Sequence, residues 1–227
     1  FRELDWLAAY RRRFVLKNIY IGGGTPTSLN EAQLERLLRK VEELFHPNDT
    51  MEYTVEAGRP DTITAEKLRL LKQYGVNRIS INPQTMNDKT LLAVGRRHTV
   101  EDIRRVFREA RAAGHENINM DLILGLPGEN AADVRHTMEE IERLNPDNVT
   151  VHTLAVKRAS RLREELSQHD LTTAEELEAM LDIAAEYAAK MGMEPYYMYR
   201  QKNMVGNFEN VGYCRPGKEG VYNVQIM

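Results

Sequence analysis

Short β-type runs alternate with amphipathic helical segments along the chain, and this alternation limits the possible fold more than any other feature. Runs such as Met-Asp-Leu-Ile-Leu at 120–124 are almost continuously apolar, as is typical of parallel strands covered by helices. The β-type runs are Asn18–Gly22, Glu52–Ala57, Arg78–Asn82, Ile118–Leu124, Asn148–Leu154 and Glu194–Tyr199. The pattern therefore predicts an α/β architecture, either barrel-like or doubly wound.

The helical segments begin at residues that can cap a helix, often with a capping-box partner three positions later. Several of them end at a glycine or before a proline, as helices commonly do. The predicted helices run from about Asn30 to Phe45, Lys67 to Tyr74, Thr99 to near Gly114, Val134 to Leu144 and Thr173 to Gly192. Since no low-complexity linker divides this pattern, residues 1–227 are expected to form a single domain.

Composition excludes several classes of protein. The 227 residues include 31 basic and 34 acidic side chains, so the net charge of −3 favours neither nucleic acid nor an anionic membrane as a partner. Neither a membrane-spanning run nor a signal peptide is visible in the sequence. With Cys214 as the single cysteine, an intrachain disulfide is impossible, and a reducing, cytoplasmic location is expected.

Both ends of the sequence are unusual. The chain starts at Phe1, within a segment with helical apolar spacing, and stops at Met227 within the strand-like run 221–227. We therefore expect an internal fragment of a longer protein, truncated at both ends.

The run Gly-Gly-Gly-Thr-Pro-Thr at 22–27 follows the first apolar strand. Three consecutive glycines lower stability, so a chain tolerates them where the backbone needs positive φ or a close approach. At the carboxyl end of a strand in an α/β protein, the approaching group is usually a ligand. A tight strand-to-helix turn with nothing bound is the alternative interpretation.

Polar residues also follow the later strands, and the carboxyl ends of parallel strands share one edge. Glu56, Gln84 and Asp121 are therefore expected on one rim with the glycine run. The two acids need hydrogen-bond or ionic partners, which a ligand with amino or hydroxyl groups would supply. Arg96 could pair with either acid or with a ligand carboxylate, and a purely structural ion pair between Arg96 and Asp121 is the alternative.

Other ligand motifs are absent from the sequence. No Gly-Lys-[Ser/Thr] follows the glycine run, and the glycines lack the Gly-x-Gly-x-x-Gly spacing, which argues against a P-loop and a dinucleotide site. The six histidines show no metal-ligand spacing with the lone Cys214, so no metal ligands are predicted. Among them, His152 alone lies at a strand end.

Four ordered motifs together resemble the radical S-adenosylmethionine enzymes, and more narrowly the oxygen-independent coproporphyrinogen III oxidase family. They are the glycine run, Gln84 after Arg78-Ile-Ser-Ile-Asn-Pro, Arg96 twelve residues later, and Asp121-Leu-Ile-Leu-Gly-Leu-Pro. The resemblance implies a partial (β/α)6-type barrel. It also implies S-adenosylmethionine and a [4Fe–4S] cluster as cofactors, and an electron-donor protein as partner. The implied reaction turns propionates of coproporphyrinogen III into vinyls.

The resemblance also assigns residues to the cofactor. Gly23, Gly24 and Thr25 match the backbone along the methionyl amino group, and Glu56 matches an acid on the first S-adenosylmethionine. The positions that match a second S-adenosylmethionine or the substrate side are Gln84, Arg96, Asp121 and Ala155. No catalytic side chain is assigned.

One part of the family pattern is missing. The family holds its cluster with a Cys-x3-Cys-x2-Cys loop after the first barrel strand, and the lone Cys214 cannot replace three thiolates. The first strand with this loop, and a C-terminal region, are expected outside the 227 residues, and the fragment alone is expected to be inactive.

Two other interpretations remain open at this point. Relatives with the same barrel carry haem as chaperones, and the motifs at 22–27 and 121–127 do not separate them from oxidases, whereas the segment from Tyr197 favours the oxidase. The second alternative interpretation is a degenerate barrel that retains only a scaffold role. If the substrate is a tetracarboxylate, the basic candidates to contact it are Lys157, Arg158, Arg200 and Lys202.

Overall fold

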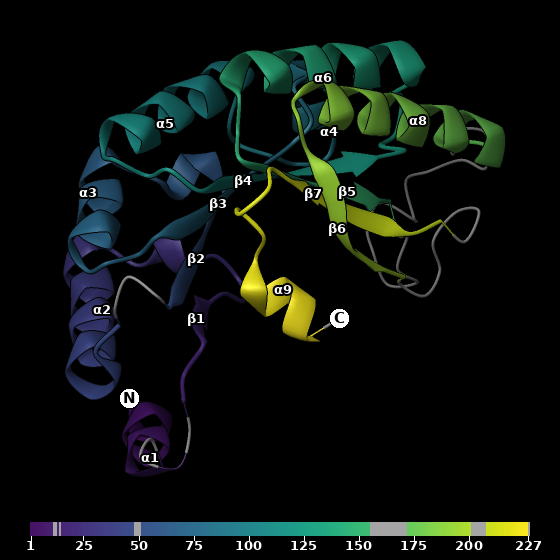
Figure 1. Ribbon diagram of the computed structural model, residues 1–227. Helices are drawn as coiled ribbons and strands as arrows, with labels where there is room; N and C mark the ends of the chain where they lie inside the picture. Colours follow the sequence, from purple (N-terminus) through teal and green to yellow (C-terminus); the bar gives the residue numbers. More distant parts are fainter. Residues whose placement is uncertain (11–12, 14, 48–50, 155–171, 201–207, 227) are drawn as a thin grey trace.

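The described residues of the chain fold into a curled, seven-stranded sheet with helices on its outer side (Figure 1). The computed structural model describes residues 1–227 except 11–12, 14, 48–50, 155–171, 201–207 and 227. In spatial order the sheet is β1-β2-β3-β4-β5-β7-β6. The strands are β1 (Asn18–Ile21), β2 (Glu52–Gly58), β3 (Arg78–Gln84), β4 (Ile118–Leu124), β5 (Asn148–Thr153), β6 (Glu194–Tyr199) and β7 (Asn210–Cys214). The predicted α/β class is confirmed.

Strands β1 to β5 are parallel and follow one another in chain order, as expected for strands joined by helical crossovers. The helical elements are α1 (Arg2–Tyr10), η2 (Pro26–Ser28), α2 (Glu31–Phe45), η3 (Pro60–Thr62), α3 (Ala65–Gln73), α4 (Asp88–Ala93), α5 (Val100–Ala112), α6 (Ala131–Leu144), α8 (Ala174–Lys190) and α9 (Val221–Ile226). Capping boxes start α2, α5, α6 and α8 at Asn30, Thr99, Asn130 and Thr173. These local signals explain why the predicted helix starts agree with the structure.

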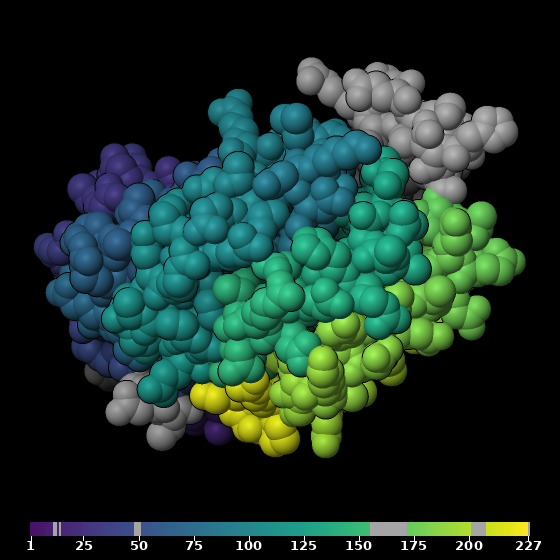
Figure 2. Space-filling model, turned by 90° about the horizontal axis from the view of Figure 1, so that it is seen from above, coloured from purple at the N-terminus to yellow at the C-terminus, as the bar shows by residue number. Residues whose placement is uncertain are grey.

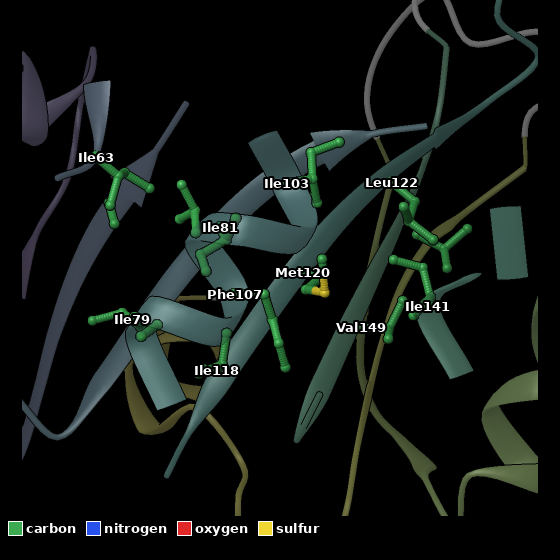
Figure 3. Packing of buried hydrophobic residues seen from close by; sticks show 14 of the residues in the cluster. Ile63, Ile79, Ile81, Ile103, Phe107, Ile118, Met120, Leu122, Ile141 and Val149 are labelled. Carbon is green, nitrogen blue, oxygen red and sulfur yellow. The ribbon is translucent and has the colours of Figure 1, made fainter. Parts of the chain in front are cut away.

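The convex face of the sheet carries the hydrophobic core. Outward-facing side chains of neighbouring strands, such as Ile79, Ile118 and Val149, pack beneath the helices with Phe107 of α5 and Ile141 of α6 (Figure 3). Seen from above, the helical side chains cover this side of the sheet (Figure 2). At about 25 cal/mol per Å² of buried apolar surface, this layer supplies most of the driving force for folding.

The concave face is polar by contrast. Because side chains alternate along a strand, the residues between the outward ones point inward, among them Ser80 of β3 and Asn119 of β4. Helix α9 lies against this concave side, and its Tyr222 stacks on Tyr20 of β1 with ring centroids 3.9 Å apart (Figure 1).

Two features of the C-terminal part differ from the sequence prediction. The run 221–226, expected to be strand-like, forms helix α9, because Glu52 of β2 accepts hydrogen bonds from the backbone N–H groups of Val221 and Tyr222. Strand β7 was not predicted. It pairs antiparallel with both β5 and β6 and thereby ends the parallel repeat. Within the described residues, no helix is long and apolar enough to cross a membrane.

Candidate functional site

A cavity of about 330 Å³ opens on the concave face of the sheet. Its walls come from six strands and α9, so it is built from parts of the chain that are far apart in sequence. The lining side chains are mostly polar or aromatic. They include Tyr20, Glu56, Arg78, Ser80, Asn119, Asp121, Thr150, His152, Tyr197, Tyr199, Tyr222 and Asn223, with the backbone of Gly23. Such a surface favours a ligand with several hydrogen-bonding groups.

Glu56 joins the glycine run to the neighbouring strand. Its carboxylate accepts a hydrogen bond from the Tyr20 hydroxyl and another, at 3.1 Å, from the backbone N–H of Gly23. Burial first, and then the Glu56 carboxylate, raise the pKa of Tyr20, so the phenol remains a donor. The hydrogen-bond donors that Glu56 was expected to need thus come in part from the protein itself, and not only from a ligand.

Gly22 is required by this close approach. A Cβ atom at this position would lie 2.4 Å from Cε1 of Tyr20 and 2.9 Å from Oε2 of Glu56, which is too close for any side chain. Gly23 and Gly24 adopt left-handed φ values of 82° and 63°, which glycine adopts at little cost. The glycine run thus packs against Glu56 of β2 at Gly22, whereas no atom of the described residues beyond the adjoining ones lies within 4 Å of where a Cβ on Gly23 or Gly24 would be.

The residues that follow the glycines are held by hydrogen bonds to β2 and by the side chain of Lys67. The Thr27 hydroxyl donates to the backbone carbonyl of Ala57, and the buried ammonium of Lys67 donates to the carbonyls of Thr27 (2.7 Å) and Thr62 (3.0 Å). Lys67 is 8% exposed, so these charge-assisted hydrogen bonds hold the end of the loop firmly to η3.

Asp121 belongs to a hydrogen-bonded network across β4 and β5. It accepts from Asn119 Nδ2 at 2.7 Å, and the Thr150 hydroxyl donates to Asn119 Oδ1 at 3.0 Å. Above them, His152 Nε2 is 3.9 Å from the Asp121 carboxylate, and its Nδ1 is 2.9 Å from the Tyr199 hydroxyl. The network fixes the position of Asp121 and leaves part of the carboxylate facing the cavity.

Gln84 and Arg96 lie outside the residues that line this cavity. Gln84, 7% exposed, ends β3 with a left-handed φ of 74°. Burial lowers the pKa of Arg96, as does the nearby Arg59, while Asp61 acts in the opposite direction. Among the described residues no ion pair joins Arg96 to Glu56 or Asp121, so the predicted pairing of Arg96 with either acid is wrong. Its pairing with a ligand carboxylate stays a prediction.

The remaining predicted residues are placed as follows. Gly24 is exposed and Thr25 is half-buried, with its methyl carbon beside the position of a Cβ at Gly58. Arg200 is exposed and pairs with Glu209 at 2.9 Å. Ala155, Lys157, Arg158 and Lys202 lie outside the described residues.

The sequence prediction missed several lining residues, notably Tyr20, Arg78, Asn119 and Tyr222. A two-residue alternation could have indicated three of them, because Tyr20 shares a face with Gly22, Arg78 with Ser80, and Asn119 with Asp121. Tyr222 carried no such signal, since the sequence there resembles a strand.

Comparison with known proteins identifies the fold family. The model of the Radical SAM superfamily matches residues 2–141, more than half of the chain. The chain belongs to the radical SAM superfamily. S-Adenosylmethionine and a [4Fe–4S] cluster are the cofactors of this superfamily, and the curled sheet is a partial radical SAM barrel, as predicted.

Three relatives place the chain within radical SAM proteins. It is 46% identical over 224 residues to the oxygen-independent coproporphyrinogen-III oxidase-like protein HemZ of Bacillus subtilis, covering 98% of this chain and 44% of that protein. It is 43% identical over 143 residues to the heme chaperone HemW of B. subtilis, covering 63% of this chain and 38% of that protein. The structure of coproporphyrinogen III oxidase (HemN) from Escherichia coli superposes with a TM-score of 0.76 at 25% identity, covering 94% of this chain and 48% of that chain. The chain thus spans less than half the length of each.

The residues present suit one radical SAM cofactor and not the other. For S-adenosylmethionine, the open glycine run, the Glu56 carboxylate and the hydroxyl-lined cavity offer acceptors and donors to a ligand with amino and ribose groups. A [4Fe–4S] cluster needs cysteine thiolates. Cys214 is buried on β7, where burial first, and then Glu219, raise its pKa to about 11. In the described part of the chain, no group of three or more His, Cys, Asp or Glu could hold a metal.

Proposed function

We propose that this chain is the S-adenosylmethionine-binding part of an enzyme that decarboxylates coproporphyrinogen III to protoporphyrinogen IX. The observation that carries the proposal is the joint placement of the glycine run, Glu56 and Asp121 around one cavity. The 46% identity to a coproporphyrinogen-III oxidase-like protein supports the substrate class. When bound and reductively cleaved, S-adenosylmethionine supplies the radical that takes a hydrogen atom from a propionate.

The proposed role of the glycine run is to bind the methionyl end of the cofactor. Gly23, Gly24 and Thr25 would lie along its amino group, with Glu56 held in place by Tyr20. Because Glu56 already accepts from Tyr20 and Gly23, it is fixed before the ligand arrives, which reduces the entropy lost on binding.

The second group of residues would serve the substrate side. Asp121 faces the cavity and is oriented by Asn119, so it can accept from a ribose hydroxyl or an amino group. Gln84, Arg96 and Ala155 keep the roles that the resemblance implies, as contacts to a second S-adenosylmethionine or to the substrate side of the pocket. For Gln84 and Arg96, which lie outside the cavity lining, this requires a ligand that extends toward the carboxyl ends of the strands.

The cluster must come from elsewhere in this proposal. With a single cysteine among 227 residues, the thiolate ligands would be supplied from outside this sequence, within one incomplete barrel domain. An electron-donor protein would reduce the cluster, and the chain by itself would be inactive.

Isothermal titration of the chain with S-adenosylmethionine tests the cofactor part. Weak binding is expected, and Asp121→Ala should lower the affinity about ten-fold, since a hydrogen bond to a charged group contributes roughly 1.5 kcal/mol. Asp182→Ala, which removes an exposed acid from α8, is the matched control and should bind as the wild type does. Equal affinity of all three proteins would contradict the assignment.

A longer protein that contains this chain tests the reaction. After anaerobic reconstitution with iron and sulfide, it should form 5′-deoxyadenosine under reducing conditions when coproporphyrinogen III is present, and release carbon dioxide. Absence of 5′-deoxyadenosine would exclude the oxidase.

A haem chaperone is the second candidate. It is favoured by 33% identity over 210 residues, 92% of this chain, to the heme chaperone HemW of Lactococcus lactis. Stable binding and transfer of haem without turnover of coproporphyrinogen III would select this function.

A further inference from the structure

Arg78 is a buried cation at the floor of the cavity. It is the first residue of β3, and its side chain points to the concave face with only 2% of the residue exposed. Its Nε and Nη2 atoms are buried, and neither has a hydrogen-bond acceptor among the described residues. These two nitrogens form the edge of a guanidinium that binds a carboxylate side-on through two parallel hydrogen bonds.

The groups beside Arg78 are also hydrogen-bond donors. The Cζ atom of Arg78 and the Tyr196 hydroxyl each lie 3.2 Å, and Asn223 Nδ2 3.1 Å, from the point where a Cβ on Gly220 would be. Asn223 Nδ2 donates to the Tyr196 oxygen at 2.9 Å, which leaves the phenol proton available. We name Arg78, Tyr196 and Asn223 the donor cluster. It concentrates donors around a positive charge.

The acids of the cavity do not neutralise this charge. In the sheet register Thr54 is paired with Arg78, and Glu56 is paired with Ser80. Glu56 therefore lies on the same face as Arg78, one inward-facing pair nearer the carboxyl ends of the strands. Its carboxylate accepts hydrogen bonds from Tyr20 and Gly23. Asp121 lies higher still, two positions beyond Asn119, which is paired with Ser80. A buried charge without a partner is strongly unfavourable. An anion at the donor cluster would remove this penalty.

We propose that the donor cluster binds the carboxylate of a small molecule that occupies the cavity. The strand register places Arg78 four residues below Asp121, about 13 Å at 3.3 Å per residue. Ser80, Asn119 and Thr150 form an uncharged part of the wall between them, and Glu56 lies on the neighbouring strand at the level of Ser80. A monocarboxylate whose other end carries an amine or hydroxyls fits this order of charges. The two cavity acids would repel a dianion such as phosphate.

The ligand reaches Arg78 from the cavity. Both Arg78 and Asn223 line the cavity wall, and Asn223 also lies beside the guanidinium. The site is at the amino ends of the strands, whereas the glycine run is at their carboxyl ends. The carboxylate end of the occupant is therefore separate from the glycine run, whereas its other end would share Asp121 with the proposed cofactor site.

Titration of the chain, labelled with 15N-arginine, with sodium acetate tests the proposal. A saturable shift of the Nε–Hε signal of Arg78 is expected, and sodium phosphate or chloride at equal ionic strength should shift it less. At 100 times its Kd, acetate should shift the folding equilibrium about 100-fold toward the folded state, seen as a higher unfolding temperature. Arg78→Met should lose this response, whereas Arg108→Met, which removes an exposed cation from α5, should keep it.

Two results would overturn the proposal. One is an Arg78 signal that responds to acetate no more than to chloride, which would mean that water satisfies the guanidinium. The other is an equal thermal response of Arg78→Met and wild type. If Arg78→Met does not fold, the titration of the wild-type signal decides alone. Binding of S-adenosylmethionine, measured separately, should survive Arg78→Met, so failure here leaves the proposed cofactor site untouched.

Discussion

The two faces of the curled sheet use the same strands for opposite purposes. On β4, Ile118, Met120 and Leu122 are fully buried under the helices, while Asn119 and Asp121 face the cavity. The outward residues pack against one another and have no polar atoms to satisfy. The inward residues are hydrogen-bonded into fixed positions or left with free donors and acceptors. The contrast indicates that the convex face supplies the packing that stabilises the fold, while the alternate residues of the same strands line the cavity on the concave face.

The largest expected effect comes from the convex face. Leu122→Ala should lower the free energy of unfolding by about 2–5 kcal/mol, because it leaves a cavity in a close-packed layer. Urea unfolding measures this change. Asp121→Asn, on the adjacent position of the same strand, should change stability by less than about 1 kcal/mol. Equal losses in the two variants would break the comparison.

The glycine run should show a smaller effect. In Gly22→Ala the new methyl group collides with Tyr20 and Glu56, which should cost about 1–3 kcal/mol of stability and weaken S-adenosylmethionine binding. A double-mutant cycle with Tyr20→Leu is the control. Since leucine lacks the ring atom in the way, Gly22→Ala should cost less in that background, and an unchanged cost would exclude the collision.

The smallest effect concerns pH. Burial lowers the pKa of His115, behind α3 and α5, and of His98, near the rim. Both histidines therefore bind protons more weakly when folded than when unfolded. Their contribution to the free energy of unfolding should be fully present above the unfolded pKa of about 6.5. As the pH falls below this value, the free energy of unfolding should decrease by at most about 1.4 kcal/mol per pH unit for each histidine. Urea unfolding between pH 7.5 and 5.5 measures the slope, and His115→Gln should reduce it. A slope unchanged by His115→Gln would exclude His115 as a source.

The same contrast separates what the sequence could predict from what it could not. The helix starts at Thr99 and Asn130 depend on residues three positions away, so they can be read locally. The rim residues Glu56 and Asp121 follow from the rule that parallel strands end at one edge. Helix α9 depends on Glu52, which is 169 residues from Val221, and no local pattern contains that information.

The burial of Arg78 is another feature that the local sequence does not reveal. Its position at the start of an apolar strand is visible in the sequence, but its burial depends on Gly220 and Asn223 covering it. Likewise, the contacts of Tyr20 with Glu56 and Tyr222 are visible only in the structure, because these residues are distant in the sequence. Sites assembled from distant segments are therefore the part that required the structure.

The stack of Tyr20 on Tyr222 has a consequence for biosynthesis. A ribosome releases β1 about 200 residues before α9, so the strand that leads into the glycine run emerges long before its covering helix. During that interval the cavity wall is incomplete and the concave face is open to solvent, to chaperones and to proteases. Closing a loop of this length is also slow, which places the docking of α9 late in folding. The ligand site should therefore be the last part of the molecule to mature.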